Sequence, residues 1–285
     1  MIENVRKIAA FTYDNKGGNP AGVLIADQLP SELEMQNIAK EIGYSETAFL
    51  EPHKEGWRIR YFAPEIEIPF CGHATIASGA VLGDQNGEGR YKLYLNNSEI
   101  LIDIRRLENK NYIVELQSPE TWTANAPQIY IDEVLDQFNF TSSQLDPNFP
   151  IRFAFGGAKH LIIALKDRST LSRMNYNFEN LKQLMLSEGL ATISLCWFES
   201  DEVIHSRNPF AAGGVYEDPA TGGAAAALAG YLRDIKWNGK NRFQIIQGED
   251  MGCPCRLHVK YTPVTGESIK VSGETRYISD KRNML

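Results

Sequence analysis

The chain has 285 residues, of which 43% are hydrophobic and 23% are charged, and its formal net charge is -7. This composition is typical of a globular protein with one large or two ordinary domains. The negative charge provides no basic surface for nucleic acid or for an anionic membrane, and no apolar run approaches the roughly 20 residues that cross a bilayer. The N-terminus also lacks a long apolar signal segment. We therefore expect a cytoplasmic protein whose partners are small molecules, with no nucleic-acid or membrane partner.

The cysteine and histidine residues give no sign of a disulfide framework or a metal site. Four cysteines are too sparse for structural disulfides, and the close pair Cys253 and Cys255 has no second Cys or His pair at the spacing of a zinc finger. The five histidines show no metal-ligand spacing either. Gly-rich loops that bind nucleotide phosphates are also missing from the sequence. We expect no metal and no cofactor.

The first half begins with a hairpin and an amphipathic helix. Residues 8–13 and 21–26 have the composition of strands, and the loop between them is rich in Gly and Asn. Ser31 and Glu34 form a capping-box pattern, and apolar residues then recur at helical spacing until Gly43. The pattern predicts a helix on the outside of the fold.

Glu46 lies in the next predicted strand, residues 44–50. Alternation places it on the same face as Tyr44, Ala48 and Leu50, which is the more apolar face of the strand. Burial disfavours the charged form of a carboxyl group and raises its pKa, as a general acid/base near neutral pH requires. The residue pattern is also compatible with a Glu46 that faces solvent or pairs with an Arg.

The sequence of residues 69–75 predicts a loop that leads into a buried helix at residues 74–82. A Gly-containing turn at a helix N-terminus leaves amide groups that favour an anion, and Cys71 and His73 would stand beside this site. The helix is apolar on every side, so it must be enclosed on every side. A surface turn at 83–89 and a meander of three strands follow, at residues 91–95, 99–104 and 112–116.

The second half of the chain repeats the order of elements in the first. Strands are predicted at both ends of residues 151–165 and at 192–198, with a helix at 178–186 between them. A second loop, residues 217–223, then enters another small apolar helix. Asp218 of this loop follows Cys71 by 147 positions, close to half the chain length. We interpret the sequence as a duplicated domain.

The two loops together indicate acid/base chemistry without a cofactor. Two facing helix N-termini would hold a carboxylate through backbone amides, and side chains of the loops would flank the bound molecule. Moving a proton from one place on a substrate to another needs an acid and a base within hydrogen-bond reach.

Five segments resemble the phenazine-biosynthesis PhzF-like family of isomerases, in the family's order: residues 18–23, 43–49, 69–75, 217–224 and 247–252. The resemblance implies an α+β, diaminopimelate-epimerase-like fold with two pseudo-repeated domains, each a β-barrel-like sheet curled around a central apolar helix. It also implies an active site between the domains and commonly a homodimer. The expected boundaries are 1–118 with about 272–285 returning, a linker at 119–127, and 128–271.

The resemblance also assigns roles to individual residues. Glu46 matches the acid/base carboxylate of the family, and His73 and Asp218 match a polar pair that flanks the substrate and shares in catalysis. The implied substrate-binding residues are Asn19, Gly72, His73, Thr221, Gly222 and Gly223. The function implied is a cofactor-independent isomerase that moves a proton on a small carboxylate-bearing metabolite.

Two departures from the family pattern leave the substrate and product open. Gly223 stands where many relatives have Ser, and Cys253 stands where many have Arg. Cys71 is part of a string similar to a thiol motif of proline racemases and diaminopimelate epimerases, which use two cysteines. The second loop has Asp218 at the corresponding place, so a two-thiol mechanism fails. The alternatives are an epimerase using Cys71 with Asp218, and a metabolite-binding protein without catalysis.

Overall fold

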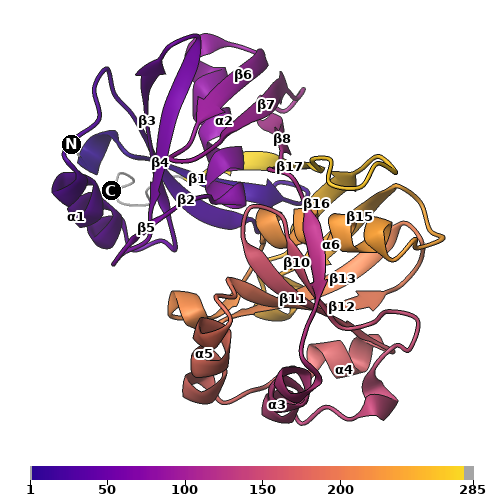
Figure 1. Ribbon diagram of the computed structural model, residues 1–285. Coiled ribbons are helices and arrows are strands. Elements are labelled where there is room, and N and C mark those ends of the chain that lie inside the picture. Colours follow the sequence, from indigo (N-terminus) through magenta and orange to yellow (C-terminus); the bar gives the residue numbers. More distant parts are fainter. Residues whose placement is uncertain (1, 279–285) are drawn as a thin grey trace. The chain divides into compact units, whose positions relative to one another are not determined.

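The structure is a computed structural model that describes residues 2–278 (Figure 1). Its contacts divide the chain into two compact units. Unit 1 holds the residues up to Gln117 and those from Ser272 onward, and unit 2 holds Ser118–Val271. Both units combine helices with a largely antiparallel set of strands, which confirms the predicted α+β class.

Unit 1 consists of strands around one long helix, with a second helix outside. Its elements are η1 (Ile2–Asn4), β1 (Arg6–Thr12), β2 (Asn19–Ile25), α1 (Glu32–Ile42), β3 (Thr47–His53), β4 (Gly56–Phe62), β5 (Glu67–Ile68), α2 (Gly72–Asn86), β6 (Gly89–Tyr94), β7 (Glu99–Arg106), β8 (Tyr112–Gln117) and, from Ser272 on, β17 (Lys270–Tyr277).

Unit 2 has a similar plan with more helices outside its strands. Its elements are β9 (Trp122–Asn125), α3 (Gln128–Phe138), η2 (Ser142–Gln144), β10 (Arg152–Phe155), β11 (Lys159–Leu165), α4 (Arg168–Ser172), α5 (Phe178–Ser187), β12 (Thr192–Phe198), β13 (Val203–Phe210), η3 (Ala211–Gly213), β14 (Val215–Asp218), α6 (Gly222–Asp234), β15 (Arg242–Gln247), η4 (Glu249–Met251) and β16 (Cys255–Lys260).

The hairpin and helix predicted at the start of the chain are confirmed. β1 pairs with β2 in antiparallel fashion. α1 begins with the predicted capping box, in which the side chain of Ser31 accepts from the amide of Glu34 and the Glu34 carboxylate accepts from the amide of Ser31. The helix ends at Gly43, whose φ of 71° is left-handed and therefore suits glycine. Its buried residues Met35 and Ile38 pack in one core cluster with strand residues of unit 1.

The strand predicted at residues 44–50 begins three residues later than expected and runs on to His53. β3 begins at Thr47, so Glu46 lies in the connection just before the strand rather than within it. The Glu46 carbonyl still accepts a hydrogen bond from the amide of Gly22 at 3.2 Å, which anchors this connection beside β2. Glu46 is therefore held by backbone contacts although it is not part of the ladder.

α2 is the enclosed helix that its apolar sequence predicts, and it is longer than expected. Every residue from Gly72 to Gly83 is buried, and the helix contacts β1, β2, β3, β7 and β8. The turn predicted at 83–89 is wrong in its first part, because the helix continues to Asn86. Gly83 allows this: a Cβ there would lie 2.7 Å from the ring of Tyr112, so the bare backbone lets β8 cover another turn of the helix.

The two units share one strand topology. In unit 1, β2 and β3 are parallel, β3 and β4 antiparallel, and β4 and β6 parallel. In unit 2, β11 and β12 are parallel, β12 and β13 antiparallel, and β13 and β15 parallel. In unit 1, the short strand β5 pairs with β4 and the central helix α2 follows it. In unit 2, the short strand β14 pairs with β13 and the central helix α6 follows it. The predicted pseudo-repeat is therefore present.

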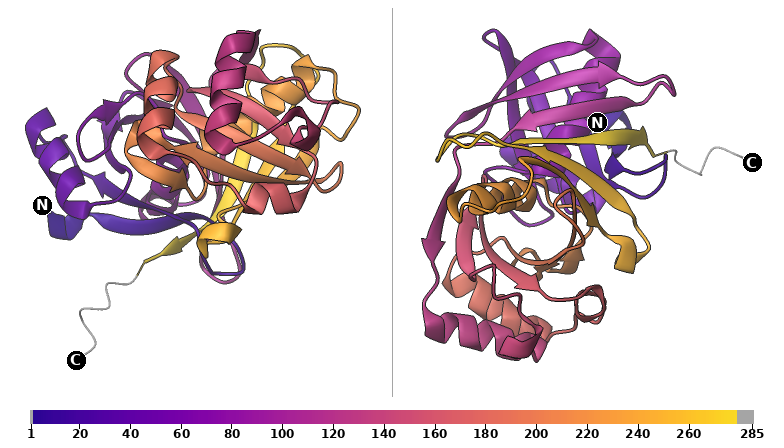
Figure 2. Two further views of the ribbon diagram at one scale, coloured as in Figure 1. Left: turned by 90° about the horizontal axis from the view of Figure 1, so that it is seen from below. Right: turned by 90° about the vertical axis from the view of Figure 1, so that its right-hand side faces the viewer.

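Unit 2 buries both faces of its central strands. α6 packs against β9, β10, β11, β12 and β16, and the strands wrap around it (Figures 1 and 2). On the other face, a second core joins α3, α4 and α5 to alternate strand residues such as Leu161, Ile163 and Leu195. The sequence had given no expectation for α3. β9, which lies within the stretch expected as a linker, pairs with β10.

Among the described residues, no helix is long and apolar enough to cross a membrane.

We predict that Gly79→Ala lowers the free energy of unfolding by about 1–3 kcal/mol, although Ala is the better helix former. A Cβ at this buried position would lie 2.6 Å from Cγ1 of Val114, well inside contact distance. Urea unfolding measures the effect. The double variant Gly79→Ala with Val114→Ala is the control, since removing the methyl groups makes room and the two losses should be less than additive. Strictly additive losses would contradict the close packing.

A second prediction concerns His160 on β11, whose side chain is buried and whose Nδ1 lies 2.8 Å from Oγ1 of Thr192. Burial lowers the pKa of His160 to about 3, whereas an unfolded histidine has a pKa of about 6.5. The unfolded chain binds more protons between these values, so the free energy of unfolding falls as the pH drops, by up to about 1.4 kcal/mol per pH unit.

Urea unfolding between pH 4 and pH 7 should therefore show the advantage of the native protein over His160→Gln shrinking as the pH falls. His258→Gln, at an exposed position of β16, is the matched control, because it removes a histidine without disturbing the core. Parallel pH profiles for the native protein and His160→Gln would contradict the prediction.

Candidate active site

Three side chains predicted to take part in chemistry converge in unit 1. Oε2 of Glu46 lies 3.2 Å from Nε2 of His73. Nδ1 on the other side of the same ring lies 3.4 Å from Sγ of Cys71. All three residues are buried, with exposed fractions of 4–6%. The connection before β3 supplies the carboxylate, and the N-terminus of α2 supplies the thiol and the imidazole.

Burial sets the proton affinity of Glu46. It raises the pKa of the Glu46 carboxyl above its ordinary value, against smaller lowering effects of hydrogen bonds from Ser45 and Cys71. Oε2 accepts no well-aligned hydrogen bond from any described residue, although it is close to the His73 ring. Glu46 is thus a carboxyl group shielded from solvent, and its Oε2 can exchange a proton with a bound molecule.

The N-terminus of α2 is fixed by hydroxyl groups that lie beneath it. The amide of Thr75 is the first to bond back along the helix, to the carbonyl of Cys71 at 3.0 Å. The Thr75 hydroxyl donates to the same carbonyl at 2.7 Å and shares a hydrogen bond with the Tyr61 hydroxyl, also at 2.7 Å. The earlier amides, including that of Gly72, have no acceptor within the helix, so with the helix dipole they favour an anion.

Asn19 lies at the beginning of β2, where it is buried and stands opposite Ala10 of β1. Ser45 was missed by the sequence analysis as a site residue, and its hydroxyl lies 3.4 Å from Nε2 of His73. Its position next to Glu46 in the segment 43–49 was the only signal that could have found it.

In unit 2, the second predicted loop forms its own polar cluster. Asp218 ends β14 and is buried. Thr221 is the N-cap of α6, and its hydroxyl donates to Oδ2 of Asp218. Gly222 and Gly223 form the first turn of α6 and are also buried. The structure therefore brings together Asp218, Thr221, Gly222 and Gly223 within this unit.

Gln247, at the end of β15, holds the cluster together and was not predicted as a site residue. Its side-chain amide donates to the carbonyl of Asp218 at 2.7 Å and lies 3.2 Å from Oγ1 of Thr221. Its side-chain carbonyl accepts from the amide of Thr221 at 3.2 Å. Gln247 belongs to a segment that carried the family resemblance, but nothing in the sequence shows that it reaches back to the loop.

An Arg–Glu pair precedes each of the two loops, half-buried in unit 1 and buried in unit 2. In unit 1, Arg60 of β4 binds Glu67 of β5 through two parallel hydrogen bonds. In unit 2, Arg207 of β13 binds Glu217 of β14 in the same way, and Glu217 is the neighbour of Asp218. Such bidentate pairs fix geometry as well as adding energy. An Arg–Glu contact before the loop is thus repeated in both units.

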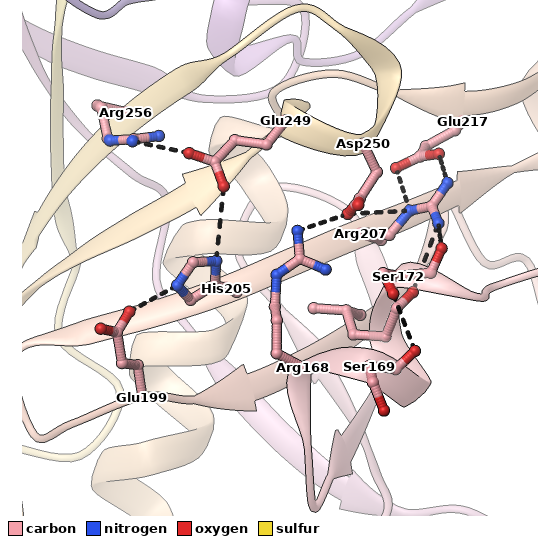
Figure 3. A network of polar contacts seen from close by, with 11 residues as sticks. Arg168, Ser169, Ser172, Glu199, His205, Arg207, Glu217, Glu249, Asp250 and Arg256 are labelled. Carbon is pink, nitrogen blue, oxygen red and sulfur yellow. Dashed lines mark hydrogen bonds and ion pairs between the residues drawn. The ribbon is translucent and has the colours of Figure 1, made fainter.

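Further ion pairs of unit 2 extend from Arg207 to the segment after Gln247 (Figure 3). Asp250 accepts from Nη2 of Arg168 at 2.8 Å and lies 3.9 Å from Nε of Arg207. Its neighbour Glu249 accepts from Arg256 at 2.9 Å. These contacts tie η4 to α4, β13 and β16, and so support the position of Gln247.

Comparison with known proteins gives a match over nearly the whole chain. Residues 8–280 match the family described as phenazine biosynthesis-like protein. An uncharacterized isomerase of Clostridium acetobutylicum is 30% identical, with 95% of this chain and 94% of that protein covered. A trans-2,3-dihydro-3-hydroxyanthranilate isomerase of Pseudomonas aeruginosa is also 30% identical, with 98% of both proteins covered.

Solved structures confirm the predicted fold. A Bacillus anthracis phenazine biosynthesis protein of the PhzF family superposes with a TM-score of 0.81 at 24% identity, covering 96% of both chains. A hydroxyproline epimerase of Agrobacterium vitis superposes with a TM-score of 0.67 at 12% identity, covering 96% of this chain and 88% of that chain. At these identities the likeness concerns the fold alone, which is diaminopimelate-epimerase-like.

The unit 2 cluster gives a prediction for Gln247. Gln247→Leu should lower the free energy of unfolding by about 1–3 kcal/mol, because it leaves the buried polar groups of Asp218 and Thr221 without their partner. Urea unfolding measures the loss. Gln244→Leu, on the same strand but only half-buried, is the matched control and should have a smaller effect. An equal loss in both variants would contradict the bridging role of Gln247.

Proposed function

Because the chain belongs to the phenazine biosynthesis-like (PhzC-PhzF) family, whose named relatives are isomerases, we propose that it is a cofactor-independent isomerase. In this proposal, Glu46 moves a proton on a small carboxylate-bearing metabolite. The observation that carries it is the buried carboxylate of Glu46, 3.2 Å from the His73 ring. A group of this kind can give or take a proton near neutral pH without a metal or a cofactor.

The proposed reaction uses the Glu46 carboxylate twice. It first takes a proton from the substrate, and the electron pair of the broken bond moves into the unsaturated system of the substrate. The protonated carboxyl group then returns the proton at another atom of the same system, which restores the carboxylate. The His73 ring, whose Nε2 lies 3.2 Å from Oε2, stabilises the charged state of Glu46 by its closeness. Exclusion of water by the buried surroundings strengthens the electrostatic interactions of the reacting groups.

The proposed substrate carries an anionic group, and helix N-termini support this choice. In unit 1 the first turn of α2, which contains Gly72, favours negative charge, and Asn19 is assigned to substrate binding with it. In unit 2 the first turn of α6 offers the same kind of group, with Asp218 as a further polar residue for catalysis. The substrate-binding residues proposed there are Thr221, Gly222 and Gly223.

A homodimeric state and a cytoplasmic location are also part of the proposal. The first rests on the family resemblance and the second on the composition of the sequence.

Glu46→Gln should lower turnover by about 10²–10⁴-fold, because the amide cannot take a proton. Substrate binding should remain, since Gln has nearly the same shape. The assay incubates the protein in deuterated water with trans-2,3-dihydro-3-hydroxyanthranilate, the compound in the name of one relative, and with a panel of small unsaturated carboxylic acids. Mass spectrometry follows product and deuterium, and thermal shift follows binding. Undiminished turnover by Glu46→Gln would refute the role of Glu46.

The same assay separates the alternatives. An epimerase that uses Cys71 with Asp218 would lose its activity in Cys71→Ser. The observation that supports this alternative is the contact of Cys71 with the His73 ring. Retained turnover in Cys71→Ser would exclude it. A metabolite-binding protein without catalysis would show a thermal shift with one of the acids, but no product and no deuterium uptake.

A further inference from the structure

We propose that Glu46, Cys71 and His73 bind a zinc ion, and that this ion inhibits the enzyme by occupying the carboxylate. The three donor atoms, one from each residue, lie within 4.8 Å of one another. Among the described residues no other group of three such side chains comes together in this way. The inference rests on the proposed function only where it concerns inhibition, because binding of the ion needs no turnover.

Two of the donor atoms have the spacing of neighbouring zinc ligands. Ligand atoms of a tetrahedral zinc site are about 3.3–3.6 Å apart, given bonds of about 2.0–2.3 Å. Sγ of Cys71 and Nδ1 of His73 are 3.4 Å apart, which matches one edge of such a site. Glu46 supplies a third donor atom within 4.8 Å of the other two, and a fourth position remains for water. Three protein ligands with one open position are typical of zinc sites that exchange ligands.

Burial makes a divalent cation favourable at this place. The thiol and the carboxyl group are both nearly inaccessible to water, so their anionic forms lack solvation. A zinc ion would neutralise a thiolate and a carboxylate together, while the neutral imidazole supplies the third bond. Oε2 of Glu46, which accepts no well-aligned hydrogen bond from the described residues, is already turned toward the His73 ring.

The chemistry of the donors selects the metal. Sulfur and nitrogen ligands favour zinc, whereas magnesium and calcium prefer oxygen. Zinc and substrate would compete, because both need the carboxylate of Glu46. We therefore expect zinc to raise the apparent KM for substrate and to leave kcat unchanged, and we expect a chelator to reverse the effect.

Cobalt(II), whose complexes absorb visible light, is the probe for the site. The full-length native protein, kept reduced without added thiols, should bind one cobalt ion with a thiolate charge-transfer band, and zinc should displace it. Cys71→Ser should lose the band, and Glu46→Gln should bind cobalt at least about 10-fold more weakly. Cys253→Ser is the matched control and should keep both band and affinity. Magnesium at the same concentration should displace nothing.

Three results would overturn the site: no band in the native protein, an unchanged band in Cys71→Ser, or loss of the band in Cys253→Ser. Thermal unfolding shows that each variant is folded, and Cys71→Ala replaces Cys71→Ser if the latter is not. A cobalt band in a protein without isomerase turnover would support the metal site while the proposed function fails. Turnover that depends on Glu46, in a protein without the cobalt band, would support the proposed function while the metal site fails.

Discussion

The enclosure of α2 is the constraint on which the rest of unit 1 depends. A helix that is buried on every side has no freedom to shift, because any movement would open cavities or create clashes in a close-packed interior. Gly79 and Gly83 show how tight the enclosure is, since a single methyl group at either position would overlap the strand residues Val114 or Tyr112. The first turn of the helix is fixed as a consequence. Cys71 and His73 are therefore presented in one geometry, which is what precise proton transfer needs.

The same enclosure gives Glu46 its chemical character. A carboxyl group in solvent would be ionised near neutral pH and would be a weak base. The connection before β3 is held beside β2 and faces the N-terminus of α2, where burial raises the pKa of Glu46 while Ser45 and Cys71 provide partial compensation. The fold thus uses the packing that stabilises it to tune the one group that the proposed reaction requires.

The duplicated plan explains why the two units look alike in topology and differ in their chemistry. Both place an Arg–Glu pair before a loop and a small apolar helix after it. The loop of unit 1 carries a thiol and an imidazole, and the loop of unit 2 carries a carboxylate that Gln247 and Thr221 hold. Strand order and helix burial are thus constant, whereas the side chains at the helix N-terminus are free to diverge.

The sequence by itself determined the elements whose signals are local. The capping box at Ser31, the apolar helix after Cys71 and the repeat of loop and helix at Asp218 all follow from spacing and composition, because capping and burial act over a few residues. It failed where distant contacts decide: the extension of α2 past Gly83, the late start of β3, and the bridge made by Gln247. Only the tertiary structure brought Glu46 to Cys71 and His73, since Glu46 is not a neighbour of these two residues in the chain and no spacing rule relates it to them.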